Sequence, residues 1–188
     1  MRKIFAFLMT SLDGYHETSE GDLSWNNVDR EFLDFALEQL DEADTLLFGR
    51  KTYEHMAALW PTEAAMQGDP DVAERMNRFD KIVVSRSIPS LSWQPVALLG
   101  DDAATQLTKI KEQPGKDIAL LGSSELTASF LSAGGGVIDE VRIMVNPVIL
   151  GSGHPVLAGA DRTALELLRT RQFTSGNVLL TYQPAERA

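Results

Sequence analysis

Three short polar segments each follow a predicted strand directly, and each could bind an anion. They are Gly49-Arg50-Lys51-Thr52, Ser85-Arg86-Ser87 and Gly122-Ser123-Ser124-Glu125. The first and third segments open predicted helices, and the first N–H groups of a helix have no partner within that helix. These N–H groups and the positive end of the helix dipole favour a phosphate. The segments therefore predict a ligand that carries phosphates.

The grouping of the three segments indicates which ligand to expect. In an open α/β sheet, ligands bind beyond the carboxyl ends of the parallel strands, where such segments converge. The two helix starts suit the two phosphates of a dinucleotide. The Ser–Arg–Ser segment suits a terminal ribose phosphate, as in NADP rather than NAD. Each segment alone is a common cap or turn, and neither a Gly-x-Gly-x-x-Gly fingerprint nor a Walker A motif is present. Together, the segments favour NADPH.

Candidates for catalysis and substrate binding lie near the end of the first predicted strand. Asp13 could orient or protonate a substrate, although the Asp-Gly pair is also a simple turn. Trp25 could stack on a heterocycle, but a single tryptophan in a loop more often packs against the protein. Asp29 is one of several acids on the next predicted helix, and their spacing does not select a catalytic member. The histidines (His16, His55 and His154) have no metal-ligand spacing, so we expect no metal site.

Composition limits the partners. The net charge of -10 argues against nucleic-acid binding, because nucleic-acid binders present a basic face. The apolar run at residues 4–9 is too short for a signal peptide, and no run approaches the roughly 18 apolar residues of a membrane span. The chain has no cysteine, which suits a reducing cytosol. We expect a cytoplasmic protein whose partner is a small molecule, with neither nucleic acid nor membrane involved.

The order of the predicted elements favours one α/β domain over residues 1–188. The first two-thirds of the chain alternates strands and helices, and the last part contains strands only, which indicates a mixed sheet with antiparallel strands at its C-terminal edge. Residues 62–70 are expected to form a loop, and Gly134-Gly135-Gly136 to end a helix. The predicted strands are 3–9, 45–48, 81–85, 96–99, 117–121, 138–149, 164–173 and 177–183. The predicted helices are 28–40, 51–59, 71–79, 103–111 and 125–132.

Five segments together resemble the dihydrofolate-reductase-like superfamily. The closest resemblance is to the branch of the C-terminal reductase domain of RibD, the bifunctional riboflavin-biosynthesis protein. The similarity runs nearly end to end, and the order and spacing of the five segments are more specific than any one of them. The segments are Ser11-Leu-Asp-Gly14, Leu47-Phe-Gly-Arg-Lys-Thr-Tyr53, Ile82-Val-Val-Ser-Arg86, Leu120-Leu-Gly-Ser-Ser124 and residues 138–153.

The resemblance implies a mixed, mainly parallel sheet flanked by helices, with an NADPH site. It places Arg50, Lys51 and Thr52 on the cofactor phosphates and Ser85 and Arg86 near the adenosine 2′-phosphate. Other implied cofactor contacts are Gly49 and Gly122 to Leu126, that is Gly122, Ser123, Ser124, Glu125 and Leu126, with Leu12 and Gly14 near the nicotinamide. A homodimer is the implied assembly.

The chain also departs from its relatives in two respects. Dihydrofolate reductases bind the pterin ring through a carboxylate of the helix that follows a loop tryptophan, and the register here does not settle whether Asp29 fills that role after Trp25. The riboflavin-type reductase is fused to a deaminase, and the zinc motif of that deaminase is absent from this sequence. We therefore expect an NADPH-dependent reductase acting on a small heterocycle, most like 5-amino-6-(5-phosphoribosylamino)uracil reductase or a dihydrofolate-reductase-like relative. The alternative is a non-catalytic nucleotide-binding or regulatory module. Asp13, Asp29 or water would supply the proton, and the sequence favours Asp13.

Overall fold

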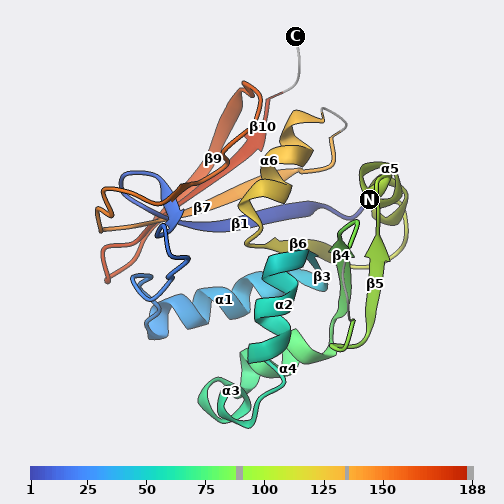
Figure 1. Ribbon diagram of the computed structural model, residues 1–188, viewed down its shortest axis with the longest axis horizontal. Coiled ribbons are helices and arrows are strands. Elements are labelled where there is room, and N and C mark those ends of the chain that lie inside the picture. The colour runs from blue at the N-terminus through green and yellow to red at the C-terminus, as the bar shows by residue number, and fades with distance from the viewer. Residues whose placement is uncertain (88–90, 134–135, 186–188) are drawn as a thin grey trace.

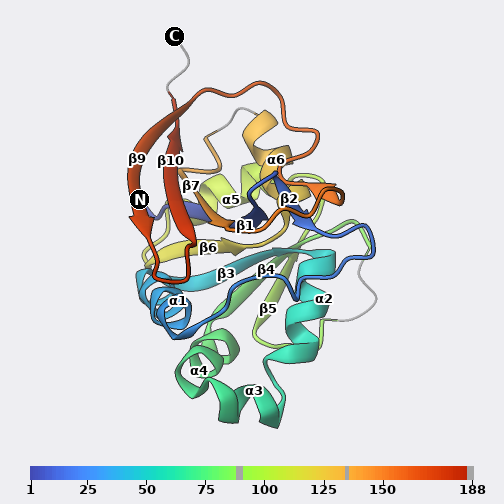
Figure 2. The ribbon, with the colours of Figure 1, turned by 90° about the vertical axis from the view of Figure 1, so that its left-hand side faces the viewer.

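An eight-stranded sheet, in the order β5-β4-β3-β6-β1-β7-β10-β9, organises the protein. The computed structural model describes residues 1–87, 91–133 and 136–185. The strands from β5 to β7 run parallel, whereas β10 is antiparallel to both β7 and β9. Helices cover both faces of the sheet, with α5 and α6 on one side and α1 and α4 on the other (Figures 1 and 2). This is the mixed, mainly parallel sheet that the sequence predicts.

The elements follow one another closely along the chain. Within the described ranges, α1 is the longest helix at 13 residues, and no helix is long and apolar enough to cross a membrane. The strands are β1 (Ile4–Ser11), β2 (Tyr15–Glu17), β3 (Ala43–Gly49), β4 (Asp80–Val84), β5 (Val96–Leu99), β6 (Asp117–Leu121), β7 (Glu140–Asn146), β8 (His154–Pro155), β9 (Leu165–Gln172) and β10 (Val178–Pro184). The helices are α1 (Arg30–Glu42), α2 (Arg50–Leu59), α3 (Glu63–Gly68), α4 (Pro70–Arg78), α5 (Ala103–Lys111) and α6 (Ser124–Ser132).

Strand β1 shows why the central strands of the sheet have an apolar sequence throughout. Its side chains alternate between the two faces of the sheet, as the strand period requires. Ile4 and Ala6 lie in the core cluster that includes residues of α5 and α6, and Phe5 lies in the cluster that includes residues of α1 and α4. Phe7 packs with Phe35 of α1 in a third cluster. A strand buried on both faces has no polar alternation, so only its length and bounding turn identified it in the sequence.

Some predicted boundaries are wrong, and helix caps explain two of them. Residues 62–70, predicted as a loop, contain α3, whose Ala65 N–H donates to the Thr62 hydroxyl at 3.2 Å. The helix predicted from residue 28 begins at Arg30, because the Asp29 side chain caps it. The predicted strands leave out residues 15–17, where the structure has the short strand β2. Gly134 and Gly135, predicted to end a helix, lie outside the described residues.

A buried lysine at the start of β4 makes the stability of the protein depend on pH. Lys81 is 1% exposed, and its Nζ donates to the carbonyl oxygens of Phe79 at 2.7 Å and Asn77 at 2.9 Å. The same nitrogen lies 4.5 Å from the ring centroid of Trp93. Burial lowers the pKa of Lys81 to about 8, although Asp80 opposes the shift. An unfolded lysine releases its proton at about pH 10.4.

We therefore expect the free energy of unfolding to gain a contribution from Lys81 as the pH rises above 8. Between the two pKa values the unfolded chain binds a proton that the folded chain has released, and stability rises with pH under that condition. The gain should reach on the order of 2–3 kcal/mol by about pH 10.5. Urea unfolding at pH 7 to 10 measures it, with Lys81→Met as the reference in which this contribution is absent. Parallel pH profiles for the two proteins would contradict the expectation.

Candidate functional site

Two helix N-termini without side-chain caps lie at the carboxyl edge of the sheet. Helix α2 follows β3 through Gly49, and α6 follows β6 through Ser123; neither N-cap side chain bonds its own helix. Strands β3 and β6 are neighbours in the sheet, so the two helix starts lie next to each other. The first N–H groups of both helices are therefore available to a ligand, and anions are the ligands that such groups favour.

The two predicted phosphate segments are joined by a direct hydrogen-bond relay. The Gly49 N–H donates to the Ser123 hydroxyl at 2.7 Å, and that hydroxyl donates to the Thr52 hydroxyl at 2.9 Å. Gly122 and Ser123 both have left-handed backbone, with φ of 66° and 55°. A Cβ on Gly122 would lie 3.3 Å from the Thr52 methyl carbon, and one on Gly49 would lie 3.0 Å from the Ser123 hydroxyl oxygen. We call this arrangement the Gly49–Ser123 junction.

The charged residues around the junction are exposed. Arg50 and Lys51 begin α2 on the protein surface, and Arg50 Nη1 lies 3.6 Å from a Glu54 carboxylate oxygen. Glu125 is exposed in the first turn of α6. Leu126 is half-buried and packs against the core, so its side chain contributes packing rather than a polar contact.

Ser124 has a different environment from its neighbour. It is buried, and its hydroxyl accepts the Leu157 N–H at 2.7 Å, which ties the start of α6 to the segment that follows β8. The geometry thus gives Ser124 a structural hydrogen bond, whereas the Ser123 hydroxyl lies in the junction between the two helix starts.

The third predicted segment lies at the end of the neighbouring strand β4. The Ser85 hydroxyl accepts the Ser87 N–H at 3.1 Å and donates to the Ser87 carbonyl at 3.0 Å, so it closes its own turn. Arg86 Nε lies 2.9 Å from an Asp101 carboxylate oxygen, and both side chains are largely exposed. The structure therefore places all three segments on consecutive strands β4, β3 and β6, along one edge of the sheet.

Asp13 is held by hydrogen bonds that favour its charged form. Its carboxylate accepts the Ser11 hydroxyl at 2.7 Å and the N–H groups of Leu150 at 3.1 Å and Gly151 at 2.8 Å. The Ser11 hydrogen bond, supported by those of Leu150 and Gly151, holds the pKa of Asp13 below its usual value. A carboxylate in this environment is a poor proton donor, and its contacts instead fix the loop before β8 against the end of β1.

The residues next to Asp13 form a tight turn. Gly14 has φ of 88°, and its N–H donates to the Ser11 carbonyl at 3.1 Å. Leu12 is 65% exposed, and its N–H donates to the Val148 carbonyl at 2.8 Å. The contacts of Leu12 and Gly14 with a nicotinamide ring stay a prediction.

The other two substrate candidates have structural hydrogen bonds. Asp29 caps α1 by accepting the Phe32 N–H at 2.8 Å. Trp25 is half-buried in the loop before α1, and its Nε1 donates to the Asp22 carbonyl at 3.0 Å. The capping bond accounts for Asp29 without a catalytic role, and the stacking role of Trp25 stays a prediction.

His16 is a candidate residue of the functional site that our sequence reasoning missed. It lies on β2, which pairs with β8, and its ring centroid is 6.3 Å from that of His154. Burial lowers the pKa of His16; Glu17 and Glu125 oppose the shift, and His154 and Lys51 add to it. Its ring is thus close enough to sense charges on the first turns of both α2 and α6. We considered the histidines only as metal ligands, and no group of three potential ligands among the described residues could hold a metal ion.

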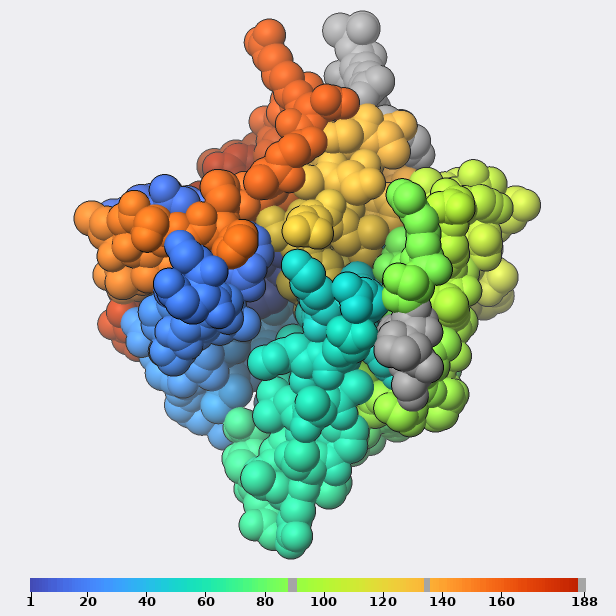
Figure 3. All heavy atoms as spheres, in the orientation of Figure 1, coloured from blue at the N-terminus to red at the C-terminus, as the bar shows by residue number. Residues whose placement is uncertain are grey.

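A hollow on the protein surface lies between these elements. Figure 3 shows it between the segment of β2 and α1 on one side and α2 on the other, below α6. Three half-buried apolar side chains pack against the Phe7–Phe35 cluster: Met9 of β1, Phe32 of α1 and Leu121 of β6. Partly exposed apolar side chains suit one face of a flat ring rather than a charged group.

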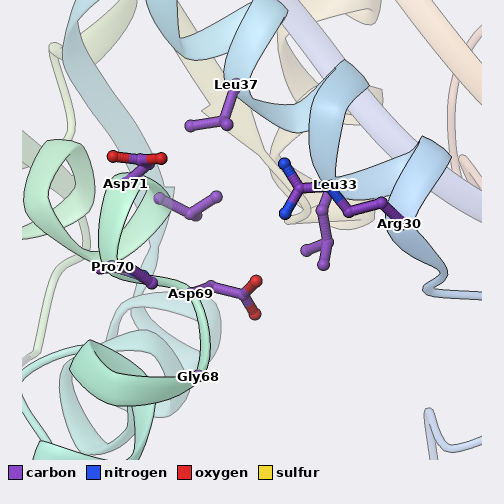
Figure 4. A pocket seen from close by; sticks show the side chains of 8 residues that line it. Arg30, Leu33, Leu37, Gly68, Asp69, Pro70 and Asp71 are labelled. Atoms are coloured by element: carbon purple, nitrogen blue, oxygen red, sulfur yellow. The ribbon is translucent and has the colours of Figure 1, made fainter.

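A second groove is separate from the strand ends. It lies between α1 and the start of α4, has a volume of about 90 Å³, and is lined by apolar residues with charged residues at its rim (Figure 4). Its lining includes Leu33, Leu37 and Val72, with Arg30 and Asp69. Pockets for ligands of drug size have volumes of about 300–1,000 Å³, so this groove is too small for a dinucleotide. None of the predicted site residues lines it.

Comparison with known proteins identifies the family and the fold of this chain. The family model of the RibD C-terminal domain matches residues 2–179. The uncharacterized protein YyaP of Bacillus subtilis (strain 168) is 32% identical, over 96% of this chain and 94% of that protein. A Thermotoga maritima diaminohydroxyphosphoribosylaminopyrimidine deaminase/5-amino-6-(5-phosphoribosylamino)uracil reductase is similar in structure (TM-score 0.72, 14% identity, 98% of this chain and 57% of that chain). So is Enterococcus faecalis dihydrofolate reductase, complexed with NADP(H) and RAB-propyl (TM-score 0.64, 17% identity, 98% of this chain and 97% of that chain). The chain belongs to the RibD C-terminal domain family, on a dihydrofolate-reductase-like fold.

Proposed function

We propose that this protein is an NADPH-dependent reductase that transfers hydride to a small heterocyclic substrate. The observation that carries the proposal is the Gly49–Ser123 junction, where two uncapped helix starts lie side by side at the carboxyl edge of the sheet. Two adjacent sets of free N–H groups suit the two phosphates of one dinucleotide. Glycine at positions 49 and 122 lets the two helix starts approach each other, because a Cβ there would crowd Ser123 or Thr52, and this close pair of helix starts fits the cofactor.

The chain's own residues would bind the cofactor and keep the site dry. The N–H groups at the starts of α2 and α6, with Arg50, Lys51 and the Thr52 hydroxyl, would hold the phosphates. Bound NADPH supplies the hydride. The apolar surface of Met9, Phe32 and Leu121 would hold a flat ring and exclude water from it, which is the contribution that a hydride-transfer site needs from the protein.

We propose water as the proton donor. Asp13 accepts three hydrogen bonds and has a lowered pKa, so water is a better candidate than this carboxylate. Asp29 is committed to the Phe32 N–H. A non-catalytic nucleotide-binding module, the alternative from the sequence, would have the same junction and would bind NADPH without turning over any substrate.

The environment of α1 favours a pyrimidine over a pterin as substrate. The resemblance to dihydrofolate reductases implies a free helix carboxylate for the pterin. Here Asp29 accepts the Phe32 N–H, Glu31 accepts both the N–H and the hydroxyl of Thr174 at 2.7 and 2.6 Å, and Asp34 pairs with Arg30 at 2.8 Å. Since the carboxylates in the first turns of α1 are engaged, the substrate we propose is an aminopyrimidine of the kind named for the Thermotoga maritima protein.

We also propose a single cytoplasmic domain that forms a homodimer, as the family resemblance implies. The edge strand β9 gives structural support for a partner surface, because it exposes three leucines, Leu165, Leu167 and Leu168, by 38, 56 and 44%. Exposed leucines on an unpaired edge favour association with another chain. Sedimentation equilibrium distinguishes a dimer from a monomer.

Isothermal titration calorimetry with NADPH tests the proposed cofactor. We expect Arg50→Ala to weaken binding on the order of tenfold, because a charge-assisted contact with phosphate is lost. Arg30→Ala is the matched control: Arg30 also begins a helix and pairs with an acid four residues on, but it lies at the start of α1, away from the junction. Absence of NADPH binding, or equal effects of the two substitutions, would sink the proposed site. Assays with aminopyrimidines, pterins and simple carbonyl compounds then separate an enzyme from a binding module.

A further inference from the structure

At the corner of the sheet where β4 and β5 end, the side chain of Arg86 is already paired with a carboxylate. Strands β4 and β5 are parallel neighbours, and the Ser85 N–H donates to the Leu99 carbonyl at 3.0 Å, which keeps their ends together. Arg86 follows β4, and Asp101 follows β5. Because of this geometry, Arg86 Nε lies 2.9 Å from an Asp101 carboxylate oxygen.

The local charge at this corner is negative rather than positive. Asp102 is adjacent to Asp101, and its side chain makes no capping hydrogen bond with α5. One guanidinium and two carboxylates give a formal charge of -1 for Arg86, Asp101 and Asp102 together. The Ser85 hydroxyl is committed to the turn with Ser87. A site that selects a phosphate concentrates cations and donors.

A carboxylate beside a ribose has a different use from an arginine. In dinucleotide-binding folds, an acidic side chain accepts the ribose 2′-hydroxyl of NAD, whereas an arginine accommodates the 2′-phosphate of NADP. This corner presents one residue of each kind in contact with each other. The two side chains therefore favour opposite cofactors.

We propose that Asp101 is a specificity-determining residue, which competes with a 2′-phosphate for Arg86 and so narrows the preference for NADPH over NADH. The proposal rests on the proposed function, since it requires a nicotinamide dinucleotide along this edge of the sheet. Binding of NADPH separates Arg86 from Asp101 and leaves that carboxylate next to the phosphate. Binding of NADH would leave the ion pair intact, and the Asp101 carboxylate could accept a hydrogen bond from the ribose 2′-hydroxyl of NADH.

The expected effect is moderate, because the pair is open to solvent. The side chains of Arg86 and Asp101 are 86 and 82% exposed. Water and salt screen both the ion pair and the repulsion between Asp101 and a phosphate. Removing the Asp101 charge should therefore raise the ratio of NADPH to NADH affinity by about three- to tenfold at low ionic strength, and by less at high ionic strength.

Calorimetric titration of the full chain with NADPH and with NADH tests this proposal. Asp101→Asn should raise the affinity ratio, and Arg86→Ala should lower it. Asp102→Asn is the matched control, because it removes the same charge one residue away, where the structure shows no contact with Arg86. We expect the control to change the ratio by less than about twofold.

The outcomes separate this inference from the proposed function. If NADPH binds and Asp101→Asn changes the ratio no more than Asp102→Asn does, the role of Asp101 is overturned while the cofactor site stands. The same holds if Asp101→Asn lowers the ratio. If neither dinucleotide binds to the wild-type protein, the proposed function fails and this inference fails with it.

Discussion

Replacing Arg142 with methionine is expected to lower the free energy of unfolding by about 3–4 kcal/mol. Arg142 is 3% exposed on β7. Its guanidinium donates to Glu140 at 2.6 Å, to Glu42 at 2.5 Å and to Gln39 at 3.4 Å, and its carbon Cζ lies 3.9 Å from the ring centroid of Phe5. Removing Arg142 is costly, because the Glu140 carboxylate, only 8% exposed, then keeps its ion pair with the half-exposed Arg169 alone among the described residues.

A second arginine provides the matched control. Arg169 also donates to Glu140, at 2.9 Å, but its side chain is 53% exposed. Arg169→Met should cost less than about 1 kcal/mol, since exposed ion pairs contribute little. Adding Glu140→Leu to Arg142→Met should recover part of the loss, because it removes a buried carboxylate whose remaining ion pair, with Arg169, is largely open to solvent. Urea unfolding measures all three, and equal losses for Arg142→Met and Arg169→Met would contradict the account.

The parts of the fold that the sequence predicted well are those with local signals. The predicted helix 103–111 and strand 117–121 agree residue for residue with α5 and β6. The missed helix α3 has a local signal too, a threonine cap followed by Glu63 and two alanines, so that error lies in our interpretation of the sequence. The predicted strand 138–149 is too long, because periodicity does not show where a strand loses its partners: β7 covers only Glu140–Asn146.

The functional site was predictable as separate segments but not as an assembly. The sequence identified both helix starts, yet it could not show that Ser123 bonds Gly49, because those residues are 74 positions apart and meet only through the strand order β3-β6. Two of the three partners of the Asp13 carboxylate, Leu150 and Gly151, similarly lie more than 130 residues away, whereas Ser11 is local. These contacts changed our interpretation of Asp13 from a proton donor to a loop anchor.

His16 was not identified from the sequence as a candidate site residue, for the same reason. Its position two residues after Gly14 is visible in the sequence, but the pairing of β2 with β8 and the nearness of Lys51 and Glu125 depend on the folded chain. Local patterns report caps, turns and strand lengths. They do not show which side chains, distant in the sequence, come together on one surface. A binding site is formed by such side chains.

The largest expected effect on ligand binding comes from Gly122→Ala, which should weaken NADPH binding by at least about tenfold. Gly122 has φ of 66°, a conformation that costs an L-residue about 1 kcal/mol. Its new Cβ would also lie 3.3 Å from the Thr52 methyl carbon, so Thr52 has to give by a few tenths of an ångström, and we expect the start of α2 to shift with it away from that of α6. Such a shift separates the two sets of N–H groups that we propose for the cofactor phosphates.

Gly136→Ala, Thr52→Ser and the combination of Thr52→Ser with Gly122→Ala separate the steric cause from the backbone strain. Gly136→Ala has nearly the same φ, 65°, with no atom within 4 Å of the new Cβ, so it should lose similar stability and leave NADPH affinity unchanged. Adding Thr52→Ser to Gly122→Ala removes the methyl group but keeps the hydroxyl that accepts from Ser123, so binding should return to within about threefold of Thr52→Ser alone. Calorimetry gives the affinities and urea unfolding the stabilities.

If Gly136→Ala weakens binding as much as Gly122→Ala, or if Thr52→Ser restores nothing, the contact between Gly122 and Thr52 does not position the two helix starts. If Gly122→Ala binds NADPH like the wild-type protein, the phosphates do not bind at the Gly49–Ser123 junction.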